Sequence, residues 1–155
     1  MSRDYEEFIA ALNDHGVRYL VVGAHALAVH AKPRATKDLD IWLEPTPDNA
    51  RRLLAAIGVF FGGEDLGYSV EELLDPRWII QLGVAPVRID LLSEILGLPD
   101  FSEAYGRRLE GKFGPVDTVY VGLDDLIAAK RAAGRKQDEA DLMALERARR
   151  RRTKC

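Results

Sequence analysis

The order of apolar and polar residues along the chain predicts alternating helices and strands. Residues 4–16 carry apolar side chains at helical spacing, with Asp4 as the expected N-cap and Gly16 as the expected end. The continuous apolar run at 17–23 predicts a short buried strand. The alanine- and leucine-rich residues 24–31 predict a helix that begins directly after that strand.

A second strand and a clearly marked helix come next. Residues 38–44 combine acidic and large apolar side chains in the pattern of a strand. In the following helix we expect Thr46 as N-cap, Pro47 in the first position and Gly58 at the end.

The middle of the chain predicts a loop, a hairpin and a further helix and strand. Residues 60–69 are glycine-rich and favour a loop. The runs 77–83 and 87–92 read as two strands of a hairpin, because only three residues separate them. We expect a short helix at 100–110 and then a strand at 115–122, which its initial proline would confine to a sheet edge.

Two helices, at 123–134 and 138–150, are predicted to close the chain. The hairpin excludes a purely parallel sheet, so we expect an α+β (α/β) fold with a mixed sheet flanked by helices. No linker divides the 155 residues, and we expect one domain. Its parts would be a core at about 17–122, a helical part at 123–150 and a basic tail at 147–155.

Composition adds an expected location but no particular partner. The net charge is −3, and no apolar run approaches the roughly 18 residues of a membrane helix. Cys155 is the single cysteine, so an internal disulfide is excluded and a reducing interior is the default. The charged N-terminus does not resemble a signal peptide, and we expect a cytoplasmic protein without membrane contact.

Two carboxylates in the second predicted strand are the first candidates for chemistry. Asp38 and Asp40 are separated by one residue, so they point to the same face with Cα atoms roughly 6.6 Å apart. Carboxylates at this spacing can share a divalent cation, and oxygen ligands suit Mg²⁺ or Mn²⁺. The alternative is an ordinary pair of charges, because the Asp-x-Asp pattern is common.

A third acid, Asp90, lies in the predicted strand at 87–92 and projects from the face opposite its apolar neighbours. A carboxylate in such a strand is costly unless it is paired or binds a metal. The alternatives are an ion pair with Arg88 on a solvent face or a metal site shared with the first two acids.

Gly23 stands between a predicted strand and a predicted helix. Glycine there lets backbone N–H groups approach an anion at the helix N-terminus, although a simple turn also uses it. If the first two strands are neighbours, a phosphate site would lie beside the carboxylates, as phosphoryl or nucleotidyl transfer requires.

These motifs resemble the minimal bacterial nucleotidyltransferases of the DNA polymerase beta-like superfamily. The family pattern is a hydrophobic residue, Gly, then Gly or Ser, followed by Asp-x-Asp and later by an acid between hydrophobic residues. Here Val22, Gly23 and Ala24 match the first part, "DLDI" at 38–41 the second and "IDL" at 89–91 the third. The match covers residues 17–92, and the string that starts at Gly23 is also similar to toxins of bacterial abortive-infection and toxin–antitoxin systems.

The resemblance implies a two-metal nucleotidyl transfer. Asp38 and Asp40 would hold Mg²⁺ or Mn²⁺ against an NTP such as ATP, and Asp90 would help to bind the second metal. The acceptor would be a hydroxyl of RNA, such as a tRNA end, or of a protein. Ala24 departs from the pattern and removes a hydroxyl from the phosphate site. The alternative is therefore a catalytically weak nucleotide- or partner-binding domain of the same fold.

Further residues are candidates for nucleotide binding. Besides Gly23 and Ala24, the set comprises Thr36, Lys37, Lys130 and Arg135, with Arg34 as a weaker candidate. Lys130 lies on an apolar helix face and could equally extend its stem over the core. Asp138 favours a cap or an ion pair over a ligand role, and Asp141 fits the start of the last helix.

The remaining distinctive residues have ordinary interpretations. His25 and His30 favour core or helix-surface positions, and Trp42 and Trp78 favour the core. The basic tail is either a solvated end or a site for RNA phosphates. A sugar transferase that uses Asp-x-Asp is a further alternative, although the early glycine and Asp90 count against it. The sequence does not predict the oligomeric state.

Overall fold

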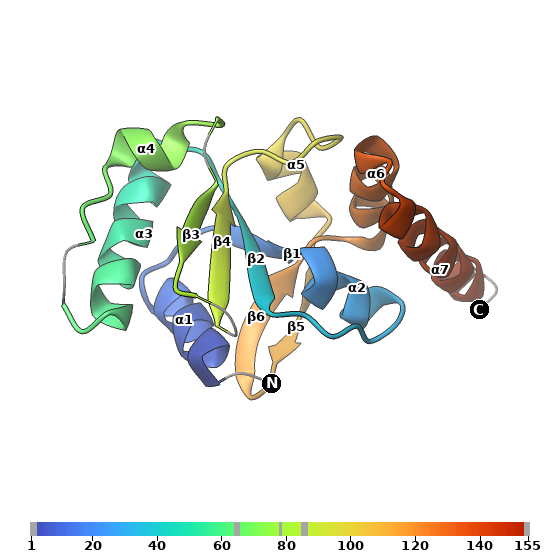
Figure 1. Cartoon of the computed structure of the whole chain (residues 1–155), viewed down its shortest axis with the longest axis horizontal. Coiled ribbons are helices and arrows are strands. Elements are labelled where there is room, and N and C mark those ends of the chain that lie inside the picture. The colour runs from blue at the N-terminus through green and yellow to red at the C-terminus, as the bar shows by residue number, and fades with distance from the viewer. Residues whose placement is uncertain (1–2, 64–65, 78, 85–86, 154–155) are drawn as a thin grey trace.

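The structure, a computed structural model, describes residues 3–63, 66–77, 79–84 and 87–153. Within these residues the strands form one six-stranded mixed sheet in the order β3–β4–β2–β1–β6–β5 (Figure 1). This sheet, flanked by helices, confirms the expected α+β class. The strands are β1 Tyr19–Val22, β2 Asp38–Leu43, β3 Ile80–Leu82, β4 Arg88–Leu92, β5 Leu109–Phe113 and β6 Val116–Tyr120.

The central strands are joined in both senses. β2 pairs antiparallel with β1 and parallel with β4, whereas β1 pairs parallel with β6 through Val21 and Tyr120. β3 and β4 form the predicted antiparallel hairpin. The acidic strands β2 and β4 are therefore direct neighbours inside the sheet.

Helices cover both faces of the sheet. Phe8 of α1 packs against Phe60 of α3 at a ring distance of 5.2 Å, and a cavity beside Phe60 is also lined by Ile89 of β4. On the opposite face, Trp42 of β2 packs against Phe101 of α5 at 5.0 Å. The helices are α1 Arg3–Asp14, α2 Gly23–His30, α3 Pro47–Phe60, α4 Val70–Leu74, α5 Phe101–Gly106, α6 Leu123–Ala133 and α7 Lys136–Thr153. Of the helices described, none is long and apolar enough to cross a membrane.

The prediction for the start of α3 was right, whereas those for its end and for the N-cap of α1 were wrong. Thr46 caps α3 by accepting the N–H of Asn49, and Pro47 begins the helix. Gly58 does not end α3, which continues to Phe60, because this glycine keeps a negative φ instead of the left-handed conformation of a helix stop. Asp4 is not an N-cap, because α1 already includes Arg3.

The region after β4 departs most from prediction. The helix expected at 100–110 ends at Gly106, and Leu109–Phe113 form β5 instead. β5 is the edge strand, whereas β6 lies between β5 and β1, so the predicted edge position of 115–122 is wrong. Pro115 occupies the turn between β5 and β6, where its missing N–H costs no ladder hydrogen bond.

The last helix continues into the basic tail. α7 extends to Thr153, and Nη2 of Arg152 lies 3.3 Å from Nδ1 of His30. Nε2 of the buried His30 lies 2.7 Å from the carbonyl oxygen of Val121. As far as Thr153, the tail is thus helical, and it contacts α2 through Arg152. Cys155 and Trp78 lie outside the described residues.

Candidate active site

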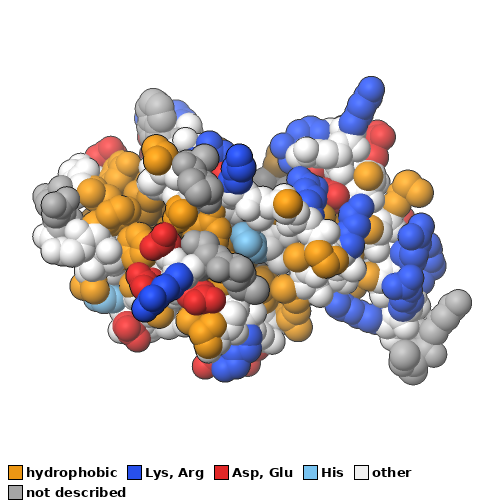
Figure 2. Space-filling view, turned by 60° about the horizontal axis from the view of Figure 1, so that its bottom comes forward, with side chains coloured by type: hydrophobic (Ala, Val, Ile, Leu, Met, Phe, Trp, Pro, Cys, Tyr) orange, Lys and Arg blue, Asp and Glu red, His pale blue; other side chains and the backbone are white. Residues whose placement is uncertain are grey.

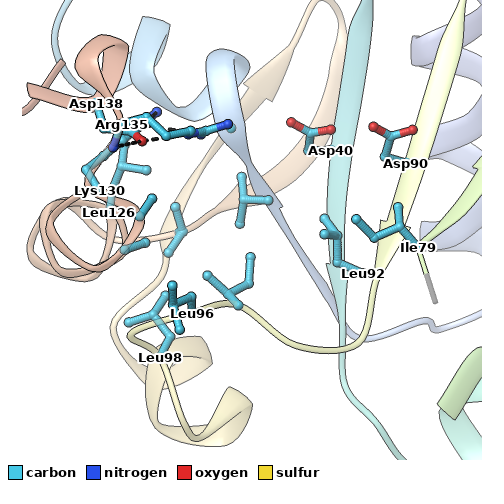
Figure 3. Close-up of a pocket in the computed structure, with 16 residues that line it drawn as sticks. Asp40, Ile79, Asp90, Leu92, Leu96, Leu98, Leu126, Lys130, Arg135 and Asp138 are labelled. Carbon is cyan, nitrogen blue, oxygen red and sulfur yellow. Dashed lines mark hydrogen bonds and ion pairs between the residues drawn. The ribbon is translucent and has the colours of Figure 1, made fainter. Parts of the chain in front are cut away.

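The sheet register brings the predicted acids together. Val22 at the end of β1 pairs with Asp40, and Asp40 pairs with Asp90 across the parallel β2–β4 ladder. Figure 3 shows the two carboxylates side by side and directed to the same side of the sheet. Leu39 and Ile89 point to the opposite face and are fully buried, so their burial fixes the direction of both acids.

Gly23 places the start of α2 against Asp40. Its φ is 69°, and a Cβ atom built there would overlap the Asp40 carboxylate. Only glycine fits, because it supplies both the positive φ and the space. The N-terminus of α2 and the carboxylates therefore lie side by side, as the glycine motif predicted.

The acids destabilise one another's charged forms. Burial, and then the negative charges of Asp90 and Asp38, raise the pKa of Asp40 to about 7. Burial also raises the pKa of Asp90, although Arg88 opposes that shift. Oδ1 of Asp90 is buried and has no hydrogen-bond partner among the described residues.

Arg88 forms ion pairs with both Asp38 and Asp90. Nε of Arg88 lies 2.8 Å from Oδ1 of Asp38 and 3.8 Å from Oδ1 of Asp90. These are ion pairs and not directed hydrogen bonds, because Arg88 Nε has no hydrogen-bond partner in the described part of the chain. The described residues accordingly contain no group of three His, Cys, Asp or Glu side chains arranged to hold a metal ion.

Asp40 and Asp90 nevertheless fit a divalent cation. Their oxygens are the hard ligands that Mg²⁺ and Mn²⁺ prefer. A bound cation would offset the burial and the repulsion that raise the pKa of Asp40, and it would ligate Oδ1 of Asp90, which has no hydrogen-bond partner among the described residues. Oδ1 of Asp38 is engaged by Arg88, and the expected three-acid metal site stays a prediction.

A cavity of about 320 Å³ opens beside the two carboxylates. Asp40 and Asp90 line one side of it, and Lys130 and Arg135 of the α6–α7 region line another (Figure 3). Leucine side chains also line the cavity, below the charged groups in Figure 3. The size is at the lower end of the range for small-molecule sites.

A family comparison agrees with this geometry. A family model described as "Nucleotidyl transferase of unknown function" matches residues 1–154. The chain belongs to that family. A search of curated proteins gives no match. Membership in this nucleotidyl transferase family supports a general nucleotidyltransferase role, and it agrees with the motifs at Gly23, Asp38, Asp40 and Asp90.

Lys130 lines the cavity, but its ammonium is already paired. Nζ lies 3.2 Å from Oδ1 of Asp138 and 3.1 Å from Oδ2 of Asp141, and only 9% of the residue is exposed. Arg135 lies 2.7 Å from Asp138, and Arg34 lies 2.6 Å from Asp141. The Arg135 guanidinium, with further help from Lys130, lowers the pKa of Asp138 to about 2.

The ion-pair role favoured for Asp138 is confirmed by these contacts. Asp138 also accepts the N–H of Arg135, which satisfies a free backbone donor at the start of α7. The nucleotide-binding roles of Lys130 and Arg135 stay predictions, as both cations would have to exchange carboxylate oxygens for phosphate oxygens.

The other predicted nucleotide-binding residues surround the start of β2 and α2. The hydroxyl of Thr36 accepts the N–H of Asp38 at 3.1 Å and thereby orients the acidic strand. Lys37 is exposed, and its backbone carbonyl accepts the Tyr5 hydroxyl at 2.7 Å. Ala24 lies in the first turn of α2, directly after Gly23.

Sequence reasoning missed the apolar side of the cavity. Leu96 and Ile79 line the cavity and are 70% and 58% exposed. Their sequence signal was weak, because isolated leucines and isoleucines in loops are common on protein surfaces. Asp141 was noted only as part of a helix start, since its contacts with Lys130 and Arg34 depend on tertiary packing.

Proposed function

We propose that the protein transfers a nucleoside monophosphate from an NTP to an acceptor hydroxyl with the help of a divalent cation. The observation that supports this most directly is the in-register pair Asp40–Asp90, with the N-terminus of α2 against Asp40. Carboxylates beside a helix start provide a cation site next to an anion site, the combination that Mg–NTP requires.

The proposed reaction is an in-line displacement at the α-phosphorus. The acceptor oxygen forms a new bond to that phosphorus, the bond to the bridging oxygen breaks, and pyrophosphate leaves with the electron pair. Asp90 accepts the proton of the acceptor hydroxyl through its carboxylate. When bound, Mg²⁺ would neutralise the charge that develops on the phosphate oxygens and lower the pKa of the acceptor hydroxyl.

The chain offers two further groups that can position the triphosphate. The backbone N–H groups of Gly23 and Ala24 lie in the first turn of α2, where the helix dipole favours anions. Lys130 and Arg135 line the other side of the cavity and can bind the phosphates that leave as pyrophosphate.

A nucleic acid such as a tRNA end is the acceptor that the charge distribution favours over a protein. Figure 2 shows lysine and arginine side chains gathered at the end of the molecule that contains α7. That end includes five exposed arginines, although the chain as a whole has a net charge of −3. Arginines on one helix attract phosphates in a salt-sensitive manner. A role in a toxin–antitoxin pair stays a prediction of the sequence resemblance.

One labelling experiment tests the proposed activity. The protein is incubated with each α-labelled NTP, Mg²⁺ and total RNA or cellular protein, and label in the acceptor fraction is measured. We expect transfer that falls at least about a hundredfold in Asp40→Asn and disappears with a chelator. Asp48→Asn is the matched control, because Asp48 is an exposed acid on α3 that pairs with Arg52. Equal transfer by wild type and Asp40→Asn would exclude the proposed mechanism.

A second candidate function is nucleotide binding without transfer. The ion pair of Arg88 with Asp38 favours it, because this pair occupies one of the three acids that the two-metal mechanism uses. Ala24, which lacks the hydroxyl of the family pattern, points the same way. Mg–NTP binding by a wild-type protein that labels no acceptor would establish this function over the first.

A further inference from the structure

The cavity has an apolar patch formed by Leu92, Leu96, Leu98, Leu126 and Ile79. In Figure 3, Leu92 and Ile79 lie below the carboxylates, and Leu96, Leu98 and Leu126 lie below the paired cations. Exposed apolar side chains that line one cavity mark a binding surface more often than scattered ones do. Two members of the patch, at 70% and 58% exposure, have much of their surface available to a ligand.

The part of the patch formed by Leu96 and Leu98 lies on a loop that packs closely against α6. Gly97 has a φ of 89°, and a Cβ atom there would come within 2.8 Å of the Ala132 Cβ and 2.9 Å of the Ala128 carbonyl oxygen. The loop that contains Leu96 and Leu98 therefore lies directly on α6 at a contact that only glycine permits. A preformed apolar surface binds a planar ring with little loss of side-chain entropy.

The polar side chains in the described lining of the cavity are all charged, and none is a neutral amide, hydroxyl or imidazole that could bind a base edge. Apart from Gly23, every described lining residue is either apolar or charged. Lys130 and Arg135 are paired with Asp138, and Asp40 and Asp90 are the proposed cation ligands. The charged groups thus bind one another, or would bind phosphate and metal. The patch is therefore available to the apolar face of a ring.

We infer that the apolar patch holds the nucleobase of the NTP and does so without distinguishing bases of the same size. The inference rests on the proposed function, because it assigns the part of the substrate that the phosphate site does not bind. Adenine and guanine have similar ring faces and differ in their hydrogen-bonding edges. A hydrophobic site discriminates weakly between such ligands, whereas a site built to hydrogen-bond one edge rejects the other by orders of magnitude.

Equilibrium binding separates this inference from the transfer activity. The probes are the α,β-methylene analogues of ATP and GTP, whose α–β linkage cannot be cleaved in transfer, and inorganic tripolyphosphate, all with Mg²⁺. We expect ATP and GTP analogues to bind within about threefold of each other. Leu96→Ser and Ile79→Ser should each weaken both analogues by up to about tenfold and leave tripolyphosphate unchanged.

The variants are suited to the test because both side chains are largely exposed and contribute little to the core. Val59→Ser is the control, since Val59 is 62% exposed on α3 and does not line the cavity. A preference of more than about tenfold for one purine, or an unchanged affinity in Leu96→Ser, would overturn the inference and leave the proposed transfer intact. If the protein binds both analogues equally but transfers no label, only the proposed transfer is overturned. If it binds neither analogue, both the proposed function and this inference are overturned.

Discussion

At the scale of single residues, Asp40 is the most strongly perturbed acid of the site. It is paired with Val22 on one side and Asp90 on the other, and Gly23 lies against its carboxylate. Burial and neighbouring negative charge therefore act on the same group, and both favour its protonated form. Without a cation, the folded protein is less stable when Asp40 is ionised.

The pH dependence of stability follows from this pKa. The folded-state pKa of Asp40 is about 7, above its ordinary value of 3.8, so its contribution to stability is present below about pH 4 and lost as pH rises through 7. Asparagine is neutral at every pH, and metal-free Asp40→Asn should be more stable than wild type at pH 8 by about 2 kcal/mol. The full shift corresponds to about 4 kcal/mol, which solvent contact reduces.

Urea unfolding in a chelator at pH 5, 6, 7 and 8 measures this difference. Added Mg²⁺ should remove most of it at pH 8, because the bound cation stabilises the ionised acid. The exposed Asp48→Asn variant should show no trend. A constant difference between Asp40→Asn and wild type across this range would contradict the assigned pKa.

Gly23→Ala should destabilise the protein and displace Asp40. The new Cβ meets the carboxylate and the positive φ is unfavourable, so we expect a loss of about 2–4 kcal/mol in the free energy of unfolding. Gly58→Ala is the matched control, because a Cβ atom added at Gly58 in α3 would have nothing within 4 Å. That change should stabilise by about 0.5–1 kcal/mol. Thermal unfolding of both variants is the measurement. It shows whether the effect at Gly23 comes from its close contact with the Asp40 carboxylate and not from the general effect of replacing a glycine.

At the scale of elements, the buried Asn49 joins α3 to two strands. Its side-chain oxygen accepts the N–H of Arg18 at 2.7 Å, and its amide donates to the carbonyls of Arg18 and Glu44 at 2.9 and 3.1 Å. The chain before β1 and the chain after β2 are thereby held at the start of one helix.

Asn49→Ala should cost about 2–3 kcal/mol, since it leaves backbone groups without partners in a buried place. Thr46→Ala, at the cap of the same helix, should cost about 1 kcal/mol. Chemical denaturation of both variants gives the comparison. A larger loss for Thr46→Ala than for Asn49→Ala would show that the cap, rather than the strand connection, stabilises this end of α3.

Most elements could be predicted because their signals are local, as with Thr46 and Pro47 at the start of α3. β5 could not, since its five residues include exposed Glu110 and Lys112 and give too short an alternation for a strand. α4 was also missed, although its signal was present. Ser69 is the N-cap of this five-residue helix, and it forms a capping box with Glu72 in the first turn.

The candidate site likewise has a part that could be predicted from the sequence and a part that could not. Asp38, Asp40 and Gly23 were found because strand alternation and a strand–helix junction are encoded over a few residues. The Arg88–Asp38 pair and the carboxylate partners of Lys130 were not foreseen. They depend on which strands become neighbours and on how α6 and α7 pack, which no local pattern specifies.

At the scale of the whole molecule, a buried ion cluster connects α6 and α7 to the loop before β2. Asp141 contacts both Lys130 and Arg34, and it is 3% exposed. The loop with Arg34 leads directly into the acidic strand. The C-terminal helices therefore hold the loop that precedes the acidic strand.

Asp141→Ala should lower stability by about 2–4 kcal/mol, because it removes a partner from two cations. We also expect faster hydrogen exchange in both α7 and residues 32–37. Glu139→Ala, an exposed change on the same helix, should stay within about 0.5 kcal/mol of wild type. Faster exchange in α7 alone would contradict a connection through Arg34.

The pairing of Val21 with Tyr120 joins strands that lie far apart in the chain. Such a contact forms slowly during folding, because a long loop must close before any contact energy is gained. Until β6 arrives, one edge of β1 is unpaired, and all four residues of this strand are apolar and buried in the native state. An exposed apolar edge pairs readily with another chain. Refolding yield should therefore fall as protein concentration rises.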